Sequence, residues 1–598
     1  MTRSALSVVL TTVLAFSMAP CFAAPAAAAE PVAGDTVSPI PDGADIVPGE
    51  VVVVFENGVS AEQANDAIDS AASVSSSDVS TGAVGSSVPS ATVEVAEGST
   101  EADAIRELES DPRVAFAQPN YRYTLPVPEV SSEDASAADE GDAAASAGDE
   151  FLRPLGKASA NDPERTTQWY LSGVDAVGAW GIAKCDNKVT VAVIDSGIEM
   201  AHPDLADNIV APYDLVGDAR ADGTASVPDE SPDDELGHGT HVAGIVAARA
   251  NNGTGIAGVS YNANIMPLKV FYYSQSAKGY VCETSDLLAA YRYILADAGD
   301  GTGQTRAQKL NVRVINMSLG AIWNEEQDSG DKALLAAVDE AYSKGILTVC
   351  AAGNDEYELP YKNWPSDYDT CVSVIATTEN NGKASFSNYG PEKDIAAPGS
   401  NIYSTYPSTL GYGQGYVSQS GTSMASPVVS GVCALMWAAN PSLTPDQVKN
   451  VLYQTAVDLG DPGFDDQFAN GKVNAREAVR GAAGFSTTPV ERIESLPTSA
   501  TAGEPLALSA TVSPAEASQN VIFSIKDAGT TAAVISGSSL VASHAGTVVL
   551  LATVLGGNAD GSNYVQEFSV VVTGDGSSLW DGTADTSWYN ADATEFVL

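Results

Sequence analysis

The chain has 598 residues, which is too long for one hydrophobic core, so about three or four domains are expected. Its apolar content of 44% excludes a wholly disordered protein. Acidic residues number 77 against 28 basic ones, and the net charge of −49 argues against a nucleic-acid-binding protein, because such binding needs basic patches. The acidic surface is interpreted mainly as a solubility feature; attraction of calcium or of basic substrates remains the alternative.

The first residues are typical of a secretory signal peptide, which we assign to residues 1–29. Arg3 gives a positive start, residues 5–19 form an apolar run, and the small residues that follow offer a cleavage site. This run is too short to cross a membrane, and no later stretch approaches the length of a membrane span. Cys21 suggests a lipoprotein, but Pro20 stands where a lipoprotein signal has a small residue. We therefore expect a secreted protein that is extracellular or located at the cell surface.

Five cysteines remain after removal of such a peptide, an odd number that leaves at least one free thiol in a monomer. They are Cys185, Cys282, Cys350, Cys371 and Cys433. Cys350 and Cys371 are candidates for a disulfide, but both stand in apolar, strand-like runs where buried free cysteines are equally expected. Both interpretations stay open.

Residues 48–125 show the pattern of a small α+β unit. Strand-like runs and helical patterns follow the order β-α-β-β-α-β, which is the ferredoxin-like arrangement. Strands are expected at 48–55, 91–95 and 114–123, and helices at 61–71 and 101–108. Residues 126–160 are rich in Ala, Ser, Asp, Glu and Gly, a composition that predicts a disordered acidic linker.

Residues 161–484 are predicted to form an α/β domain. Short runs rich in valine and isoleucine alternate with helical patterns, which predicts a parallel sheet with helices on both faces. Strands are expected at 188–194, 263–270, 312–317 and 345–350, and helices at 284–296, 331–344 and 473–483.

Residues 487–573 carry short strand-like runs at regular spacing, separated by Gly, Ser, Pro and Asn. This pattern favours a small β-sandwich. Its strands are expected at 506–512, 521–525, 532–535, 547–554 and 565–572.

Three polar residues of the α/β domain stand where chemistry is expected. Asp195 ends an apolar strand, and in open α/β sheets the ligand crevice lies beyond the carboxyl ends of the strands. A capping role is the alternative for Asp195. His238 begins a helix crowded with small residues, which lets the backbone pack closely and leaves the imidazole facing the crevice. Ser423 follows a glycine turn and precedes a helical run at 428–438, so its own N–H is expected at a helix N-terminus.

Neighbouring residues offer alternatives to these roles. His241 lies one helical turn after His238, so a shared metal site is possible in principle. No glutamate separates the two as in the zinc-protease motif, and we interpret His241 as a packed structural residue. Ser420 and Ser426 are interpreted as turn and cap residues. A serine hydroxyl becomes a nucleophile when a base takes its proton, so Ser423 needs an imidazole close by.

The segments around the three residues resemble the active-site signatures of the subtilase family of serine proteases. They read Val191-Ala-Val-Ile-Asp-Ser-Gly197, His238-Gly-Thr-His-Val-Ala-Gly244 and Gly421-Thr-Ser-Met-Ala-Ser-Pro427. They occur in the family's order, and the similarity covers residues 161–483. The resemblance implies that Ser423 attacks the scissile carbonyl, that His238 acts as general base and then acid, and that Asp195 holds the imidazolium.

The same resemblance implies further residues of the site. Asn354 would place its side-chain amide beside the Ser423 N–H as a second oxyanion donor. Backbone groups that pair with an extended substrate strand would come from Ser318, Leu319 and Gly320. Asp355 and Glu356 follow near the mouth of the first specificity pocket, which suggests tolerance for Lys or Arg before the cut. Solvated loop carboxylates are the alternative.

Two further segments resemble parts of the high-affinity calcium site of many subtilases. The implied ligands are the side-chain oxygens of Asp204 and Asn252, the carbonyl oxygens of Ala250, Thr254 and Ile256, and Asp162 near the mature N-terminus. Oxygen ligands of this kind suit Ca²⁺, a hard cation. Loops rich in Asn and Asp that serve only as turns are the alternative.

The flanking regions also resemble known modules. Residues 48–125 are similar to the inhibitory propeptide of subtilases, whose tail near residues 121–123 would occupy the substrate cleft until self-cleavage; the long acidic linker departs from the compact junction usual in the family. Residues 487–573 resemble bacterial immunoglobulin-like domains. Residues 574–598 resemble the start of a repeat module of surface proteins, which suggests a truncated product of a longer chain.

The expected protein is therefore a calcium-stabilised, secreted serine endopeptidase that acts on proteins and peptides and is made as a self-processing zymogen. The alternative is a surface adhesion or binding protein that uses the protease-like domain as a scaffold, because a fold alone does not imply a function.

Overall fold

The structure of the chain is a computed structural model that describes residues 44–75, 90–125, 161–217, 228–324, 330–356, 361–411, 415–484, 488–515, 517–536, 539–558 and 563–574. The predicted signal peptide (1–29), the acidic linker (126–160) and nearly all of the C-terminal segment 574–598 lie outside the described residues.

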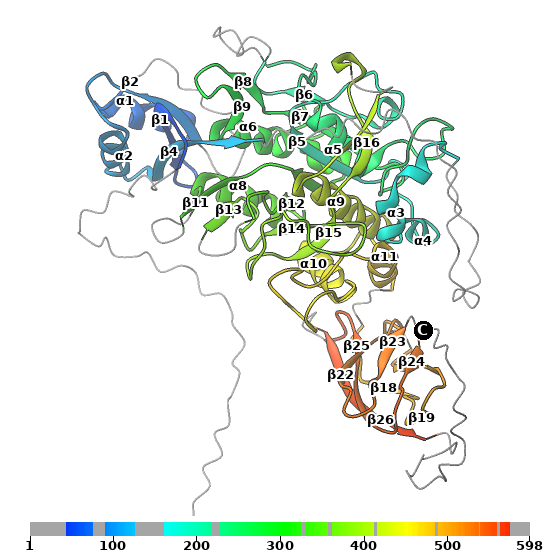
Figure 1. The fold of residues 1–598 in the computed structure, drawn as a ribbon. Helices are drawn as coiled ribbons and strands as arrows, with labels where there is room; N and C mark the ends of the chain where they lie inside the picture. Colours follow the sequence, from blue (N-terminus) through cyan, green and yellow to red (C-terminus); the bar gives the residue numbers. More distant parts are fainter. Residues whose placement is uncertain are drawn as a thin grey trace, which may run out of the picture. The chain divides into compact units, whose positions relative to one another are not determined.

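The N-terminal unit is an antiparallel sheet with two helices, as predicted (Figure 1). Its elements are β1 (Ile46–Phe55), α1 (Ala61–Ser70), β2 (Val74–Ser75), β3 (Ser90–Val95), α2 (Glu101–Glu109) and β4 (Val114–Thr124). Both helices begin with a capping box. The Ser60 hydroxyl accepts from the N–H of Gln63, whose side chain accepts from the N–H of Ser60, and Thr100 and Asp103 do the same at α2. These local signals explain why the element order was predictable.

The sheet of this unit continues into the α/β domain. On one side β4 pairs with β1, and on the other it pairs antiparallel with β9 (Gly279–Glu283). β9 in turn pairs with β8 (Tyr272–Ser274), so six strands form one sheet in the order β2-β3-β1-β4-β9-β8.

The α/β domain is built on a parallel sheet of seven strands in the order β15-β14-β12-β10-β5-β7-β6. The strands are β5 (Thr190–Asp195), β6 (Tyr213–Asp214), β7 (Asn264–Lys269), β10 (Val312–Met317), β12 (Leu347–Ala351), β14 (Cys371–Thr377) and β15 (Ile395–Pro398). After β5 the chain forms the edge strand β6 and then β7, which lies between β6 and β5, before it crosses to place β10 on the other side of β5. The strand order reverses at this point, which is where open α/β sheets form their ligand crevice.

Helices cover both faces of this sheet. Val191 and Val193 of β5 lie in one buried core together with residues of α5 and α9, whereas Ala192 and Ile194 lie in a second core with residues of α6 and α8. The helices are α5 (His238–Ala247), α9 (Thr422–Ala439), α6 (Thr284–Leu295) and α8 (Lys332–Ser343). Successive side chains of a strand point to opposite faces, so a strand buried on both sides reads as a continuous apolar run. The predicted doubly covered parallel sheet is confirmed.

α9 begins at Thr422 rather than at the predicted residue 428. Pro427 lies inside the helix, and a proline is normally expected to interrupt one. Because proline has no N–H, the carbonyl of Ser423 four residues earlier lacks a helical partner. It accepts a hydrogen bond from Ser318 Oγ (2.8 Å) instead, so the proline is tolerated and the carbonyl is satisfied.

By length and composition α9 is also the one helix among the described residues that could cross a membrane. Inside the fold 89% of this stretch is buried, as expected of a helix at the centre of an α/β domain.

Several elements of the α/β domain were not predicted, among them the strands β6, β8, β9 and β15 given above. Others are α3 (Trp169–Gly173), α4 (Ala176–Trp180), α7 (Arg306–Leu310), β11 (Ala321–Asn324), β13 (Tyr361–Trp364), β16 (Ile402–Thr405), β17 (Tyr416–Gln419) and α10 (Pro445–Gln454). The strand pairs β11–β13 and β16–β17 join segments far apart in the chain, so no local pattern specifies them. The last helix of the domain, α11 (Ala475–Ala483), was predicted.

The C-terminal region is a small β-sandwich. Its strands are β18 (Arg492–Glu494), β19 (Ser499–Thr501), β20 (Leu506–Ala507), β21 (Thr511–Ser513), β22 (Ile522–Asp527), β23 (Val534–Ser536), β24 (Ser539–Val541), β25 (Gly546–Val554) and β26 (Tyr564–Thr573). Leu540 of the sheet β20-β24-β23 packs in one cluster with Val548 and Val570 of the sheet β19-β26-β25-β22. The strand predicted at 506–512 is divided into β20 and β21.

All five cysteines within the described residues are buried thiols that form no disulfide with one another. Cys350 and Cys371 lie on the neighbouring strands β12 and β14. Burial raises the pKa of the Cys350 thiol well above its ordinary value, and the adjacent Cys371 raises it further. Of the two interpretations of Cys350 and Cys371, the structure shows the two buried thiols and not the disulfide.

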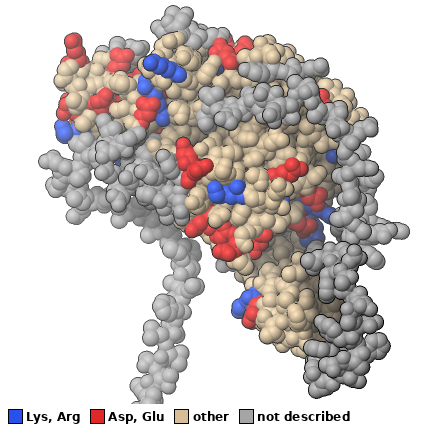
Figure 2. All heavy atoms as spheres, in the orientation of Figure 1, with Lys and Arg blue, Asp and Glu red and all other residues tan. Residues whose placement is uncertain are grey.

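The face shown in Figure 2 carries acidic side chains in small separated groups, with few basic ones between them. This distribution agrees with the net charge of −49 and with a role of the acidic residues in solubility.

Candidate active site

Asp195 and His238 form a buried hydrogen-bonded pair at the carboxyl end of the central sheet. Asp195 is the last residue of β5, His238 is the first residue of α5, and both side chains are 1% exposed. The Nδ1–H of His238 donates to Asp195 Oδ1 at 2.7 Å, and the N–H of Ser196 donates to the same oxygen at 2.7 Å. The other ring nitrogen, Nε2, is buried and has no hydrogen-bond partner within the described chain. It is the nitrogen left to accept a proton.

Small residues on α5 allow this close approach, as the sequence indicated. A Cβ added to Gly239 would lie 2.2 Å from the carbonyl oxygen of Gly197 and 3.2 Å from Asp195 Cβ. A Cβ on Gly244 would lie 2.1 Å from Thr405 Oγ1. The first turn of α5 therefore packs directly on the loop that follows Asp195.

Asp234 fixes the start of α5, a role that the sequence analysis missed. Its Oδ1 accepts from the N–H of Gly237 (2.8 Å) and from Ser196 Oγ (2.8 Å), and its Oδ2 accepts from the N–H (2.9 Å) and hydroxyl (2.6 Å) of Thr240. One carboxylate thus ties the helix of His238 to the residue next to Asp195. An acidic residue just before a helix is a known N-terminal signal, but here acidic neighbours surround it.

His241 is a structural residue. It is fully buried, and its Nε2–H donates to the carbonyl of Val417 at 3.1 Å. Burial lowers the pKa of His241 from 6.5 to about 3, so the ring is neutral at ordinary pH. Within the described residues no three His, Cys, Asp or Glu side chains are grouped to hold a metal ion.

The buried neutral ring of His241 predicts a specific loss of stability in acid. Between pH 6.5 and about 3 the unfolded chain binds a proton that the folded chain excludes, so the free energy of unfolding should fall as the pH falls. The expected slope is about 1.4 kcal/mol per pH unit from this residue. We would measure melting temperatures of Ser423→Ala protein against pH, with and without His241→Gln. The exposed His544 provides the control substitution His544→Gln, and equal pH slopes with and without His241 would contradict the prediction.

Ser423 is the second residue of α9, where its N–H is free of the helix ladder. Its hydroxyl donates to the carbonyl of Ser318 at 3.1 Å, and no hydrogen bond joins it to His238 among the described residues. The structure thus forms the aspartate–histidine pair and places the serine hydroxyl on the segment after β10.

A buried polar network holds this part of α9 on β10. Ser318 Oγ bonds Ser426 Oγ at 2.8 Å and accepts from Asn316 Nδ2 at 2.9 Å, while Ser430 Oγ donates to Asn316 Oδ1 at 2.8 Å. Ser426 is therefore structural, but it lies inside α9 and does not cap a helix as predicted. Ser420 lies in the short segment between β17 and α9, where its Oγ accepts from the N–H of Asn401 at 2.8 Å.

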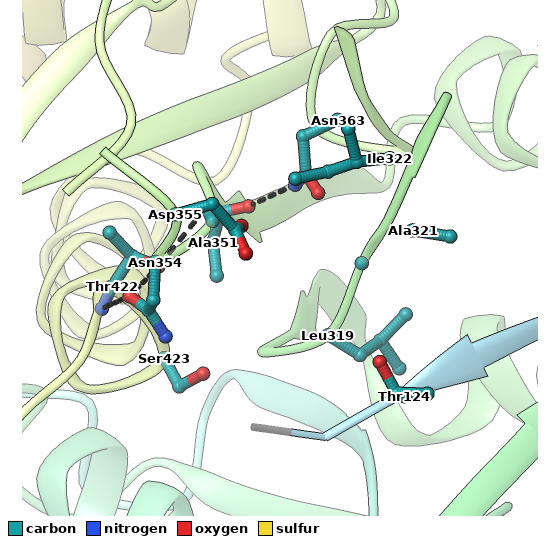
Figure 3. Close-up of a pocket in the computed structure, with 12 residues that line it drawn as sticks. Thr124, Leu319, Ala321, Ile322, Ala351, Asn354, Asp355, Asn363, Thr422 and Ser423 are labelled. Carbon is teal, nitrogen blue, oxygen red and sulfur yellow. Dashed lines mark hydrogen bonds between the residues drawn. The ribbon is translucent and has the colours of Figure 1, made fainter. Parts of the chain in front are cut away.

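Asn354 lies beside Ser423 with its amide oriented by Thr422. Asn354 Oδ1 accepts from the N–H of Thr422 at 2.8 Å and from its hydroxyl at 2.9 Å. With the oxygen engaged, the Nδ2 donors point toward the side where Ser423 lies (Figure 3). The side-chain amide and the Ser423 N–H are both available to a developing negative charge.

A cavity of about 260 Å³ opens next to these groups (Figure 3). It is lined by Thr124, Leu319, Gly320, Ala321, Ile322, Ala351, Gly353, Asn354, Asp355, Asn363, Thr422 and Ser423. Asp355 is exposed at the cavity, whereas Glu356 is not part of the lining. Asn363, which the sequence analysis missed, is buried and donates from Nδ2 to the carbonyl of Ala351 at 3.0 Å.

The tail of the N-terminal unit enters this site. Thr124, at the end of β4, lines the cavity and forms an antiparallel bridge with Gly320. On its other side the strand pairs with β9, Tyr123 opposite Cys282 and Thr124 opposite Val281. The segment expected to bind a substrate strand is thus occupied by a strand of the chain itself.

The loop of residues 250–256 is held from two sides. Asp162 accepts from the N–H groups of Asn251 (2.8 Å), Asn252 (3.0 Å) and Gly253 (3.3 Å). The buried Asp204 accepts from Asn252 Nδ2 (2.7 Å), the N–H of Ile256 (2.8 Å) and the Tyr416 hydroxyl (2.8 Å). Asp162 therefore holds the loop through its backbone.

The same loop contains the carbonyl oxygens that were predicted as calcium ligands. Within the described residues no hydrogen bond reaches the carbonyl oxygens of Ala250, Thr254 and Ile256, and Ala250 and Ile256 are buried. Together with the carboxylate of Asp204, which also accepts the hydrogen bonds given above, these oxygens are of the type that a hard cation such as Ca²⁺ prefers.

Comparison with known proteins agrees with this geometry. Residues 186–471 match the model of the subtilase family, and residues 33–120 match the fervidolysin N-terminal prodomain. The chain is 35% identical over 327 residues to thermitase of Thermoactinomyces vulgaris, which covers 54% of this chain and 99% of that protein. It is 38% identical over 295 residues to subtilisin DY of Bacillus licheniformis, covering 49% of this chain and 91% of the relative.

Two further matches are a protease named as extracellular and a protease of solved structure. The minor extracellular protease Epr of Bacillus subtilis is 32% identical over 371 residues, which cover 62% of this chain and 47% of Epr. A solved protease of Pseudoalteromonas arctica is similar with a TM-score of 0.46 and 32% identity, over 54% of this chain and all of that one. The chain belongs to the subtilase family of serine endopeptidases and carries an N-terminal prodomain.

Proposed function

We propose that the protein is a secreted serine endopeptidase that cuts proteins and peptides with the triad Asp195, His238 and Ser423, and that it is made as a self-processing zymogen. The observation that carries the proposal is the buried Asp195–His238 pair, whose Nε2 is unpartnered beside the helix of Ser423. Family membership supports the endopeptidase activity, and the extracellular relatives support secretion. The immunoglobulin-like character of the C-terminal sandwich remains part of this proposal.

The geometry suggests a mechanism in two halves. The Ser423 side chain first rotates from the Ser318 carbonyl toward His238, whose Nε2 takes the hydroxyl proton as Oγ attacks the substrate carbonyl. The negative Asp195 stabilises the imidazolium that forms. His238 then gives the proton to the leaving amine, and a water molecule hydrolyses the acyl-enzyme by the same steps in reverse.

The oxyanion of each tetrahedral intermediate needs donors already in place. We assign this role to the N–H of Ser423, near the start of α9, and to Asn354 Nδ2, which Thr422 orients. Removing the asparagine donor lowers turnover by about 10²–10³, a magnitude taken from subtilisin, a relative of this chain.

The prodomain acts in this proposal as an intramolecular inhibitor. Its last strand is paired with Gly320 and with β9, where Ser318, Leu319 and Gly320 would otherwise align a substrate. Cutting of the chain after this strand, in the region of the linker, would free the end of the strand, and the prodomain would then have to leave before a substrate can bind.

The proposal is tested by incubating purified protein with casein and identifying the products by mass spectrometry. We expect new peptide termini in casein and a self-cleavage between the prodomain and the α/β domain. A serine-reactive phosphonate should stop both reactions and label the protein once. Intact casein and an unlabelled protein under conditions that preserve the fold would refute the activity.

We further propose that Ca²⁺ binds at the loop of residues 250–256, held by Asp204, Asn252 and the free carbonyls of Ala250, Thr254 and Ile256. Bound calcium would stabilise the loop and so raise the melting temperature. Removing it with EDTA should lower the melting temperature of the Ser423→Ala protein by about 5 °C or more. The melting temperature of Ser423→Ala protein that also carries Asn252→Ala should change far less on addition of EDTA. If the protein with Asn252 in place melts at the same temperature with and without EDTA, the calcium site is excluded.

The carboxylate of Asp355 at the cavity suggests a preference for a basic residue before the cut. Peptides that differ only in Phe, Leu, Arg or Glu at that position should be cut with Arg favoured over Glu. Asp355→Asn should reduce the ratio of kcat/KM for Arg and Glu peptides by about fivefold, the size expected for one exposed charge pair. Glu356→Gln, next in sequence but outside the cavity lining, is the control. If Asp355→Asn leaves the ratio of kcat/KM for Arg and Glu peptides unchanged, the preference is refuted.

A further inference from the structure

A strand of the chain itself lies where the resemblance expects a substrate strand to bind. Its side chains therefore indicate which side chains the neighbouring pockets can accommodate. Thr124 bridges Gly320, and Tyr123, one residue earlier, pairs with Cys282 of β9. A substrate strand held at the same two edges presents a side chain at the position of Tyr123. The following inference concerns that side chain and rests on the proposed protease function.

Tyr123 fills a deep pocket with a polar end. Its side chain is 0% exposed and belongs to the buried cluster that contains Leu319, Trp364 and Tyr368. The hydroxyl at the end of the ring donates to Asp331 Oδ2 at 2.9 Å. Asp331 is also 0% exposed, so a carboxylate closes the inner end of an otherwise largely apolar pocket.

The donors to Asp331 come in equal parts from the two domains. From the α/β domain, Thr284 Oγ1 donates to Oδ2 at 2.5 Å and the N–H of Leu334 donates to Oδ1 at 2.9 Å. From the prodomain, Tyr123 donates to Oδ2 and Gln118 Nε2 donates to Oδ1 at 2.7 Å. When the prodomain leaves, each carboxylate oxygen loses one donor and keeps one.

We propose that Asp331 is a specificity-determining residue that makes this pocket selective for tyrosine in protein substrates. A tyrosine restores the donor that Oδ2 has lost. A phenylalanine fills the same apolar volume and excludes water, but it has no hydroxyl to donate to Asp331 Oδ2. A buried carboxylate oxygen then lacks one hydrogen bond, which is energetically unfavourable for any buried polar group. The loss of Gln118 is the same for both substrates and cancels from the comparison.

The test begins with enzyme obtained by self-processing of the full chain. A peptide library is digested, and the cut sites are read by mass spectrometry; tyrosine should exceed phenylalanine at one fixed position before the cut. Two internally quenched peptides that differ only by Tyr or Phe at that position are then compared. We expect kcat/KM to be about 10-fold to 100-fold higher for the tyrosine peptide. A ratio near one, or a preference for phenylalanine, overturns the inference while leaving the protease function intact. Failure to cut either peptide or the library refutes the protease function itself, and the inference with it.

Variants assign the effect to Asp331. Asp331→Asn keeps the shape of the side chain and an oxygen at the start of α8 but removes the charge, and it should lower the Tyr-to-Phe ratio by about threefold or more. Glu356→Gln removes an exposed carboxylate that lies outside the cavity lining and should leave that ratio unchanged. An unchanged ratio in Asp331→Asn would overturn the role of this residue. If that variant does not fold, the two peptides on the unaltered enzyme decide alone.

Discussion

Ser423→Ala is expected to lower kcat about 10⁶-fold, the magnitude for the same change in subtilisin. The substitution removes the one atom that bonds to the substrate carbonyl and leaves the buried network of Ser318, Ser426 and Asn316 in place. The protein should therefore fold and keep its cavity. It should also stay at full length, because the cut that removes the prodomain uses the same hydroxyl.

The measurement combines peptide hydrolysis, phosphonate labelling and the mass of the purified chain. Ser420→Ala is the matched control, since it removes a hydroxyl three residues away whose hydrogen-bond partner within the described residues is the N–H of Asn401. This control should process itself and retain kcat within about tenfold. Labelling or self-cleavage that persists in Ser423→Ala would remove Ser423 from the mechanism.

Asp195→Asn is expected to lower kcat about 10⁴-fold with little change in KM. The carboxylate accepts the Nδ1–H of His238 and so leaves Nε2 without a proton, ready to act as a base. An asparagine amide at this place can donate to Nδ1 instead, which moves the ring proton to Nε2, and it cannot balance the positive charge of the imidazolium. Both effects act in the transition state rather than on substrate binding.

Asp214→Asn is the comparison for this variant, because Asp214 is also a buried aspartate at the end of a strand of the same sheet but pairs with Lys269. Measured below the melting temperature of each protein, Asp214→Asn should retain most of its kcat. A fall of less than about tenfold in Asp195→Asn would mean that the carboxylate does not set the state of the imidazole.

The positions of Asp195 and His238 were predictable because each depends on a local pattern. An apolar run that ends in an aspartate identifies the end of a strand, and a histidine before a row of small residues identifies the start of a tightly packed helix. The parallel sheet and the N-terminal α+β unit were predictable for the same reason. Periodicity and capping signals are properties of neighbouring residues.

What could not be predicted depends on contacts between distant residues. Tyr123 and Asp331 are 208 positions apart, and no local sequence pattern around either residue predicts their contact. The start of α9 was placed too late because Pro427 reads as an interruption, and only the hydroxyl of Ser318, 105 positions away, makes the earlier start favourable. The roles of Asp234 and Asn363 likewise appear only once loops have folded around them.

The six-stranded sheet shared by the prodomain and the α/β domain has a consequence for activation. Hydrolysis of one peptide bond beyond β4 frees a chain end but breaks none of the ladder that joins β4 to β9. The cleaved prodomain must still dissociate from β9, and Tyr123 must leave its pocket, before a substrate strand can bind there. Processing and unmasking are thus separate events, and in the proposed zymogen the second one would set the delay between processing and the first digested protein.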